Sequence, residues 1–229
     1  MKWGSQLTIS EWRNPEFAQQ WVGQDVLQNL LDLPRAIAAA IVAADRPDSS
    51  LVIDIGSGPG AFLERFLTAL PTARGVWSDV STTMADIARE QLSQYAPRVD
   101  FQLVDMADLH GLPFGADVIT SSRASHHLSV AELREFYAGI HARLVPGGWV
   151  VNLDHTYSVS ADWERRLRAA RTALIPPAPT SQGHHHTSVP PTAADHLDAL
   201  RAAGFTDLDM PWRAFPTCLF MARRADLDS

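Results

Sequence analysis

The residues with the clearest chemical potential follow a short apolar run, in the stretch VIDIGSGPG at positions 52–60. Three glycines and a proline stand behind Asp54, and glycine lets a backbone turn tightly and approach another group closely. Such a turn between a strand and a helix is typical of a site for a nucleotide-containing ligand. The spacing fits G-x-G-x-G and, through Ala61, also the dinucleotide pattern G-x-G-x-x-G/A. The loop alone therefore leaves the ligand open, and a plain tight turn is the simplest alternative.

An alternation of apolar strands and amphipathic helices after Leu51 predicts the elements that position this loop. We expect strands at 51–55, 74–79, 99–104, 116–122 and 149–155, with the turn LVPGGW leading into the last of them. Helices between such strands predict right-handed crossovers and a mostly parallel sheet. Strands at 206–210 and 216–224 are joined by a few residues around Trp212, which permits only antiparallel pairing. The fold class is therefore α/β, a Rossmann-like doubly wound sheet.

Helices are also expected along the chain before the first strand and after the fifth strand. Asn14 with Pro15, and Asp32 with Pro34, are N-cap and first-turn pairs that predict two helices before the first strand. We expect residues 1–50 to form a helical cover or lid, and residues 51–229 to form one compact domain. Helices at 161–174 and 193–205 flank a long loop that contains His184, His185 and His186. We interpret that loop as a segment that closes over the substrate.

Polar residues stand where each of the first five strands ends. In an open parallel sheet, ligands bind beyond the carboxyl ends of the strands. Asp79 suits a ribose diol under either loop pattern, whereas Asp54 favours a cationic ligand and repels a pyrophosphate at close range. Asp105 suits an exocyclic amine. The residues at these ends are Asp54, Gly56, Asp79, Asp105, Ser121, Ser122, Arg123, Asp154 and His155.

With LVPGGW and the closing strand pair, these features resemble the class I S-adenosylmethionine-dependent methyltransferases over residues 51–224. The resemblance implies a seven-stranded sheet with one antiparallel strand near the C-terminus, and S-adenosylmethionine as cofactor. It implies that Asp79 holds the ribose hydroxyls and that Asp105 and Met106 meet the adenine. The other cofactor contacts that it implies are Asp54, Gly56, Ser57, Gly58, Gly60 and Ser122.

The stretch SSRASHHLS at 121–129 is the candidate acceptor site, because in this family it commonly flanks the methyl group. Methyl transfer needs alignment of the acceptor, and a base only where the acceptor carries a proton of high pKa. Adjacent histidines point in different directions, so His127 or His126 is the base candidate. The alternative is that both order the loop. Arg123 pairs either with an acceptor carboxylate or with a neighbouring acid.

Four further residues are candidates for acceptor contacts. His155 and Tyr157 follow the fifth strand, and Trp12 and Trp21 are expected in the helical cover. Aromatic residues in that cover either belong to the core or wall a pocket. No metal is expected, because three consecutive histidines cannot easily converge on one ion.

Composition excludes several classes of partner. The formal net charge of -7 and a pI near 5.6 argue against nucleic acid. The single Cys218 forbids an internal disulfide and reads as a buried thiol. We expect no membrane span and a cytoplasmic location, since the N-terminus lacks a signal-peptide core and the apolar run 36–44 is short.

The resulting prediction is methyl transfer to oxygen or nitrogen of a small metabolite, with its identity and the oligomeric state left open. Two alternatives keep the same fold and cofactor. In one, cyclisation or elimination of the cofactor releases methylthioadenosine. In the other, the protein binds the cofactor as a non-catalytic partner of another protein.

Overall fold

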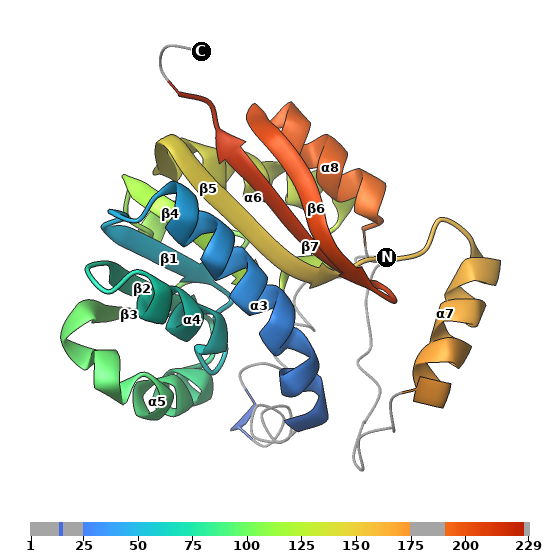
Figure 1. The fold of residues 1–229 in the computed structure, drawn as a ribbon, viewed down its shortest axis with the longest axis horizontal. Helices are drawn as coiled ribbons and strands as arrows, with labels where there is room; N and C mark the ends of the chain where they lie inside the picture. The colour runs from blue at the N-terminus through green and yellow to red at the C-terminus, as the bar shows by residue number, and fades with distance from the viewer. Residues whose placement is uncertain (1–13, 16–24, 175–190, 227–229) are drawn as a thin grey trace, which may run out of the picture.

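A seven-stranded sheet forms the centre of the computed structural model, which describes residues 14–15, 25–174 and 191–226 (Figure 1). Its strand order is β3-β2-β1-β4-β5-β7-β6. The strands are β1 (Leu51–Ile55), β2 (Arg74–Asp79), β3 (Val99–Leu103), β4 (Ala116–Ser122), β5 (Leu144–His155), β6 (Phe205–Ala214) and β7 (Thr217–Arg224). The first five pair in parallel, and β7 runs antiparallel to both β5 and β6. The predicted seven-stranded doubly wound sheet with one antiparallel strand is confirmed.

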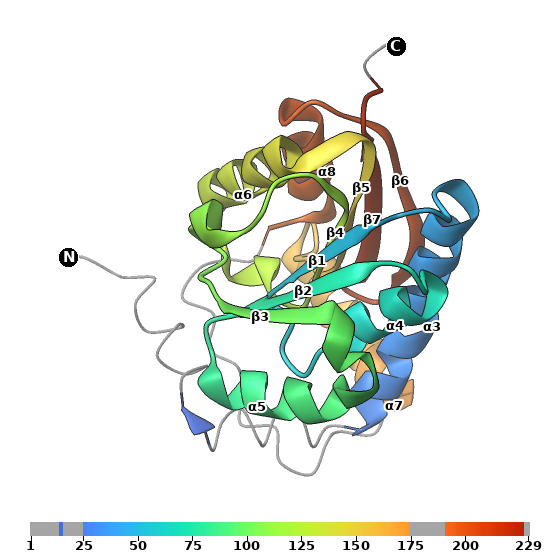
Figure 2. The same cartoon turned by 90° about the vertical axis from the view of Figure 1, so that its left-hand side faces the viewer.

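Helices cover both faces of this sheet (Figure 2). The covering helices are α3 (Asp25–Asp45), α4 (Ala61–Ala69), α5 (Thr82–Gln91), α6 (Val130–Arg143) and α8 (Ala193–Ala202). The other helical elements are α7 (Ala161–Leu174) and the short 3-10 turns η1 (Ser93–Arg98), η2 (Leu109–Gly111) and η3 (Ser125–His127). Buried residues of α3, α4 and α5 join one apolar cluster, and those of α6 and α8 join the other. Helix α7 buries none of its residues and stands apart from the sheet in Figure 1.

Helix α3 differs from its prediction. Asp32 and Pro34 predict a helix start, but the helix runs from Asp25 through Pro34 to Asp45. Proline removes one hydrogen bond to the carbonyl four residues earlier, and that residue, Leu30, is 40% exposed. The next residue, Leu31, is 2% exposed and packs in the core. Packing on the sheet therefore holds the helix together across the proline.

Two more differences lie near the C-terminal half of the sheet. LVPGGW is not a turn before β5 but an irregular part of that strand, because the register slips between the pairs Ala116–Leu144 and Val118–Trp149. Gly147 has a φ of 72°, which lets the backbone bulge there. Trp212 lies within β6 opposite Leu219 rather than in the closing turn, and it packs against the core.

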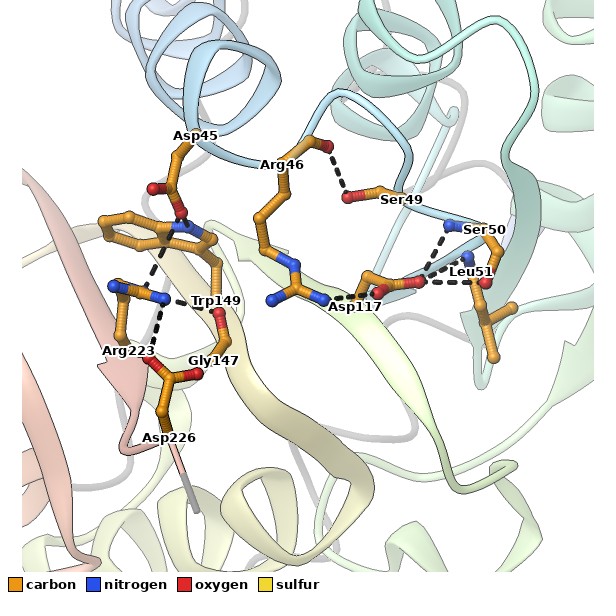
Figure 3. A network of polar contacts seen from close by, with 10 residues as sticks. All are labelled: Asp45, Arg46, Ser49, Ser50, Leu51, Asp117, Gly147, Trp149, Arg223 and Asp226. Carbon is orange, nitrogen blue, oxygen red and sulfur yellow. Dashed lines mark hydrogen bonds and ion pairs between the residues drawn. The ribbon is translucent and has the colours of Figure 1, made fainter. Parts of the chain in front are cut away.

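Asp117 connects β4 to the start of β1, at the end of the sheet where these parallel strands begin (Figure 3). Its carboxylate accepts hydrogen bonds from the backbone nitrogens of Ser50 (2.8 Å) and Leu51 (3.2 Å), and Arg46 forms an ion pair with it at 3.0 Å. Burial on its own raises the pKa of Asp117, but these bonds outweigh it and lower the pKa. Nearby, the Trp149 indole donates to Asp45 at 2.8 Å. Because β1 starts here and ends at the glycine loop, this network holds the strand from the end opposite the loop.

Cys218 is buried in β7, as the sequence predicts. Of the helices in the described ranges, none has the length and apolar character needed to cross a membrane.

Candidate functional site

The glycine loop follows β1, and its three glycines serve different purposes. All have positive φ angles, which side-chain-bearing residues rarely adopt. A Cβ on Gly56 would lie 2.6 Å from the Cβ of Ala124, and one on Gly60 would lie 2.8 Å from Leu92. These two glycines are therefore required for packing. A Cβ on Gly58 would meet nothing within 4 Å, so this glycine leaves open space above the loop.

The same loop is anchored firmly to β2. The Trp77 indole donates to the carbonyl of Gly58 at 2.8 Å, and the Gly58 nitrogen donates to the carboxylate of Asp79 at 2.9 Å. The Ser57 nitrogen donates to the carbonyl of Ser78 at 3.0 Å. The backbone is thus fixed from the β2 side while its other side stays bare.

Asp54 lies behind the loop and not on its open side, which corrects the prediction of direct cofactor contact. It is 0% exposed, and its two carboxylate oxygens accept hydrogen bonds from Ser57 (2.6 Å) and Thr120 (2.7 Å). Burial is the main reason that the pKa of Asp54 is raised, and these two hydrogen bonds oppose the shift. Because Thr120 belongs to β4, Asp54 links the loop to the neighbouring strand.

A cleft with about 850 Å³ of space, counting the part open to solvent, lies over the loop. It sits beyond the carboxyl ends of β1 and β4, where the strand order reverses, which is the usual ligand position in this architecture. Predicted residues on its wall are Gly56, Ser57, Gly58, Asp79, Asp105, Met106, Ser122, Arg123 and His127. Wall residues that the sequence analysis missed are Arg35, Pro59, Ala61, Phe62, Val80, Met84, Val104 and Ala124. Gly60 does not line the cleft.

Arg35 is the missed residue with the strongest chemical character. It comes from α3, is 3% exposed and lies on the cleft wall. Burial lowers the pKa of Arg35, while the charges of Asp54 and Asp32 raise it. In the sequence, Arg35 could have been noticed only as a single charged residue in the otherwise apolar run after Pro34.

Two carboxylates occupy the wall on the side of β2 and β3. Asp79 binds the Gly58 nitrogen with one oxygen and the Ser81 nitrogen with the other, both at 2.9 Å. Burial raises the pKa of Asp79, and these backbone hydrogen bonds partly oppose the rise. Asp105 accepts from the Ala107 nitrogen at 2.9 Å, and its neighbour Met106 lines the same wall.

Ser122, Arg123 and His127 form the wall at the end of β4 and in η3. Arg123 has a φ of 57°, and its backbone nitrogen donates to the carbonyl of Leu153 at 3.0 Å. Burial lowers the pKa of Arg123 to about 10, with the charge of Asp154 acting in the opposite direction. A cation and an imidazole thus face the same space as the glycine loop.

His126 points away from this space, so of the two base candidates only His127 lies on the described wall. His126 is 2% exposed, and its Nδ1 lies 2.6 Å from Asp154. The rings of His126 and His127 are 4.1 Å apart. Burial alone would raise the pKa of Asp154, but His126 and Ser125 lower it, so this carboxylate stays ionised.

The other predicted acceptor contacts lie elsewhere. Nδ1 of His155 is 2.9 Å from Oγ1 of Thr217, and Tyr157 forms a bridge with Thr192; neither His155 nor Tyr157 lines the cleft. The described cleft wall therefore does not include these two predicted contacts. Trp12, Trp21 and the loop with His184, His185 and His186 lie outside the described residues.

A buried polar network behind η3 was also missed from the sequence. The Asn152 amide donates to Ser125 Oγ and to Tyr137 Oη, both at 2.8 Å, and Tyr137 Oη lies 2.8 Å from His196 Nδ1. Ser125 in turn donates to Asp154 at 2.6 Å. The chain of hydrogen bonds therefore runs from α8 through α6 and β5 to the turn that carries His127.

Metal ligation finds no support in the described part of the chain, where no group of three His, Cys, Asp or Glu residues is arranged to hold an ion.

Comparison with known proteins places this site in context. A family model described as a methyltransferase domain matches residues 52–148. The chain is similar to the trans-aconitate 2-methyltransferase of Variovorax paradoxus, with 32% identity over 44% of this chain and 37% of that protein. It is also similar to the 3-amino-4-hydroxybenzoate 4-O-methyltransferase of Streptomyces cremeus, with 31% identity over 47% of this chain and 29% of that protein. These matches therefore span less than half the length of either relative.

The fold has close structural counterparts. Human N-acetylserotonin methyltransferase, solved in complex with SAM, aligns with a TM-score of 0.69 and 18% identity, over 96% of this chain and 59% of that one. At this identity the likeness concerns the fold alone.

Proposed function

We propose that the chain is a class I S-adenosylmethionine-dependent methyltransferase that transfers a methyl group to oxygen or nitrogen of a small molecule, and the match of residues 52–148 to a methyltransferase domain supports this. The observation that carries this proposal is the bare backbone at Gly58. Gly56 and Gly60 are explained by packing, but the space above Gly58 is left open and faces the cleft. The positive φ of Gly58 already favours glycine, and the open space beside it lets a ligand approach the backbone closely.

The cleft offers a distinct partner for each part of the cofactor. We assign the ribose hydroxyls to Asp79, whose carboxylate is already fixed by the Gly58 and Ser81 nitrogens. We assign the adenine to the wall formed by Asp105 and Met106. The methionine carboxylate is assigned to Arg35, because this buried cation lies on the wall beside the loop and feels the charge of Asp54.

The acceptor is assigned to the wall at the end of β4. There His127 is the candidate base for an acceptor whose proton must leave, and His126, held by Asp154, supports its ring from behind. Both similar curated proteins named above are methyltransferases whose names specify small organic acids, which supports a small-molecule acceptor. Trans-aconitate and 3-amino-4-hydroxybenzoate are therefore the first acceptors to assay.

The test of the cofactor site is calorimetry with S-adenosylhomocysteine on a matched pair of variants. Gly58→Ala places a methyl group in the open space over the loop, and we expect it to weaken binding by about tenfold or more. Gly115→Ala is the control. Gly115 also has a positive φ (83°) and free space, but it precedes β4 and so lies at the opposite end of the strands from the cleft. Equal affinity for the two variants would contradict the proposed site.

The test of the reaction is product analysis with labelled S-adenosylmethionine. Methyl transfer yields S-adenosylhomocysteine and a labelled acceptor. Methylthioadenosine as the product would instead establish cyclisation or elimination, and binding without any consumption of the cofactor would establish a non-catalytic protein. For the base, His127→Ala should lower turnover strongly and leave S-adenosylhomocysteine affinity within about twofold. Unchanged turnover would remove His127 from this role.

A further inference from the structure

The guanidinium of Arg123 lies on the cleft wall and is not fully hydrogen-bonded by the described residues. Its Nε and Nη1 atoms are buried, and they have no hydrogen-bond partner among the residues that the structure describes. The hydroxyl of the adjacent Ser122, on the same wall, is likewise buried without a partner in that part of the chain. A buried charge without a partner is strongly unfavourable in a folded protein. The site is therefore incomplete without an anion.

Among the described residues, no neighbouring acid supplies that anion. Asp154 is the carboxylate whose charge acts most strongly on Arg123, but it already accepts hydrogen bonds from Ser125, from His155 and from two nitrogens of His126, at 2.6–2.8 Å. Within the described residues, Arg123 forms no ion pair with it. Of the two roles that the sequence allows for Arg123, a salt bridge to a neighbouring acid is thus not formed in the described part of the chain.

The backbone of Arg123 adopts a strained conformation. Its φ of 57° is a conformation that a residue with a long side chain rarely adopts, and such strain is found mostly at functional sites. The hydrogen bond from its backbone nitrogen to Leu153 fixes the position between β4 and β5. From this position Arg123 lines the cleft.

The location of Arg123 separates it from the cofactor contacts. The glycine loop, Asp79 and Asp105 lie at the ends of β1, β2 and β3, whereas Arg123 lies at the end of β4 with His127. The cleft has a second buried cation, Arg35, on the loop side. The carboxylate of the cofactor and the anion at Arg123 therefore require separate positions.

We propose that Arg123 and Ser122 form a carboxylate receptor for the methyl acceptor, so that the substrate is a small carboxylic acid held with its reacting atom near His127. This inference rests on the proposed methyl transfer. A guanidinium fork matches the two oxygens of a carboxylate, and the serine hydroxyl adds a further donor.

The test compares carboxylates with their neutral amides on the complex with S-adenosylhomocysteine. Calorimetric titrations use benzoate against benzamide and acetate against acetamide. At least one carboxylate should bind about tenfold more tightly than its amide, and Arg123→Met should abolish this preference. Arg123→Lys, which keeps the charge but not the fork, should retain part of it. The same preference in the wild type and in Arg123→Met, or no preference in either pair, would overturn the proposal.

Two control measurements separate this role from others. S-adenosylhomocysteine affinity should stay within about twofold in Arg123→Met; a loss of tenfold or more would instead assign Arg123 to the cofactor carboxylate. The Tm of ligand-free Arg123→Met should be equal to or above that of the wild type, because an unpaired buried charge is removed. A marked fall in Tm would reveal a structural role. Failure of the wild type to bind S-adenosylhomocysteine would overturn the proposed function itself, and with it this inference.

Discussion

Replacing Tyr137 with Phe should destabilise the protein by an amount that the buried network determines. Tyr137 is 0% exposed, and its hydroxyl connects Nδ2 of Asn152 to Nδ1 of His196 at 2.8 Å each. Phe keeps the ring and its contacts but removes the hydroxyl. The substitution therefore leaves two buried polar groups without their partner, while the apolar packing stays almost unchanged.

A buried polar group that loses its partner costs about 1–3 kcal/mol. Because the Asn152 amide keeps its hydrogen bond to Ser125, its loss lies at the low end of this range, and we expect the free energy of unfolding to fall by about 2–4 kcal/mol in total. His196 is the more sensitive of the two, because its Nε2 already has no hydrogen-bond partner among the described residues. Its ring is stacked on Phe220, with centroids 4.6 Å apart, so it has no room to turn toward water.

Urea unfolding at pH 7.5 measures this loss, and Tyr95→Phe is the matched control. The hydroxyl of Tyr95 makes one exposed hydrogen bond, to Thr68 at 2.7 Å, so its removal should change stability by about 0.5 kcal/mol or less. Adding His196→Phe to Tyr137→Phe removes one orphaned group, and the double variant should recover part of the loss. A Tyr137→Phe effect as small as that of the control would refute the network.

Three further predictions concern stability. Burial lowers the pKa of His196 from 6.5 to about 4, so the unfolded state binds more protons than the folded state below pH 6.5. The free energy of unfolding should therefore fall by up to about 3 kcal/mol as the pH drops from 6.5 to 4, and the urea midpoint of His196→Phe should fall less over that range. Asp117→Asn should lose about 1–3 kcal/mol by weakening the ion pair with Arg46, with unchanged S-adenosylhomocysteine affinity by calorimetry; a loss of affinity would contradict a purely structural role. Gly60→Ala should lower Tm more than Gly58→Ala, because its Cβ meets Leu92; the reverse order would contradict the packing described.

Much of the fold follows from the sequence because strand and helix periodicities alternate clearly after Leu51. The prediction failed where long-range packing outweighs a local signal. Pro34 normally marks a helix start, but contacts with the sheet carry α3 through it. The Pro-Gly-Gly segment is typical of a turn, yet the pairs with β4 at Leu144 and Trp149 on either side keep it within β5.

The candidate site was predictable to the extent that strand ends identify the rim of the sheet. Which way a side chain turns from that rim depends on backbone angles that no pattern reveals. Asp54 and Asp79 look equivalent in the sequence, yet one is buried behind the loop and the other lines the cleft. His126 and His127 differ in the same way, because Asp154 captures one of them. Arg35 was not predicted because its helix is distant in sequence from every motif, although it lies on the same cleft wall as the glycine loop.

The most direct measurement of the cofactor site is a crystal structure of the protein with S-adenosylhomocysteine bound. We expect the homocysteine backbone over Gly58, the ribose hydroxyls on Asp79, the adenine against Met106 and the sulfur turned toward His127. A ligand bound outside the cleft, or a ribose held by groups other than Asp79 with the sulfur facing away from β4, would contradict this arrangement.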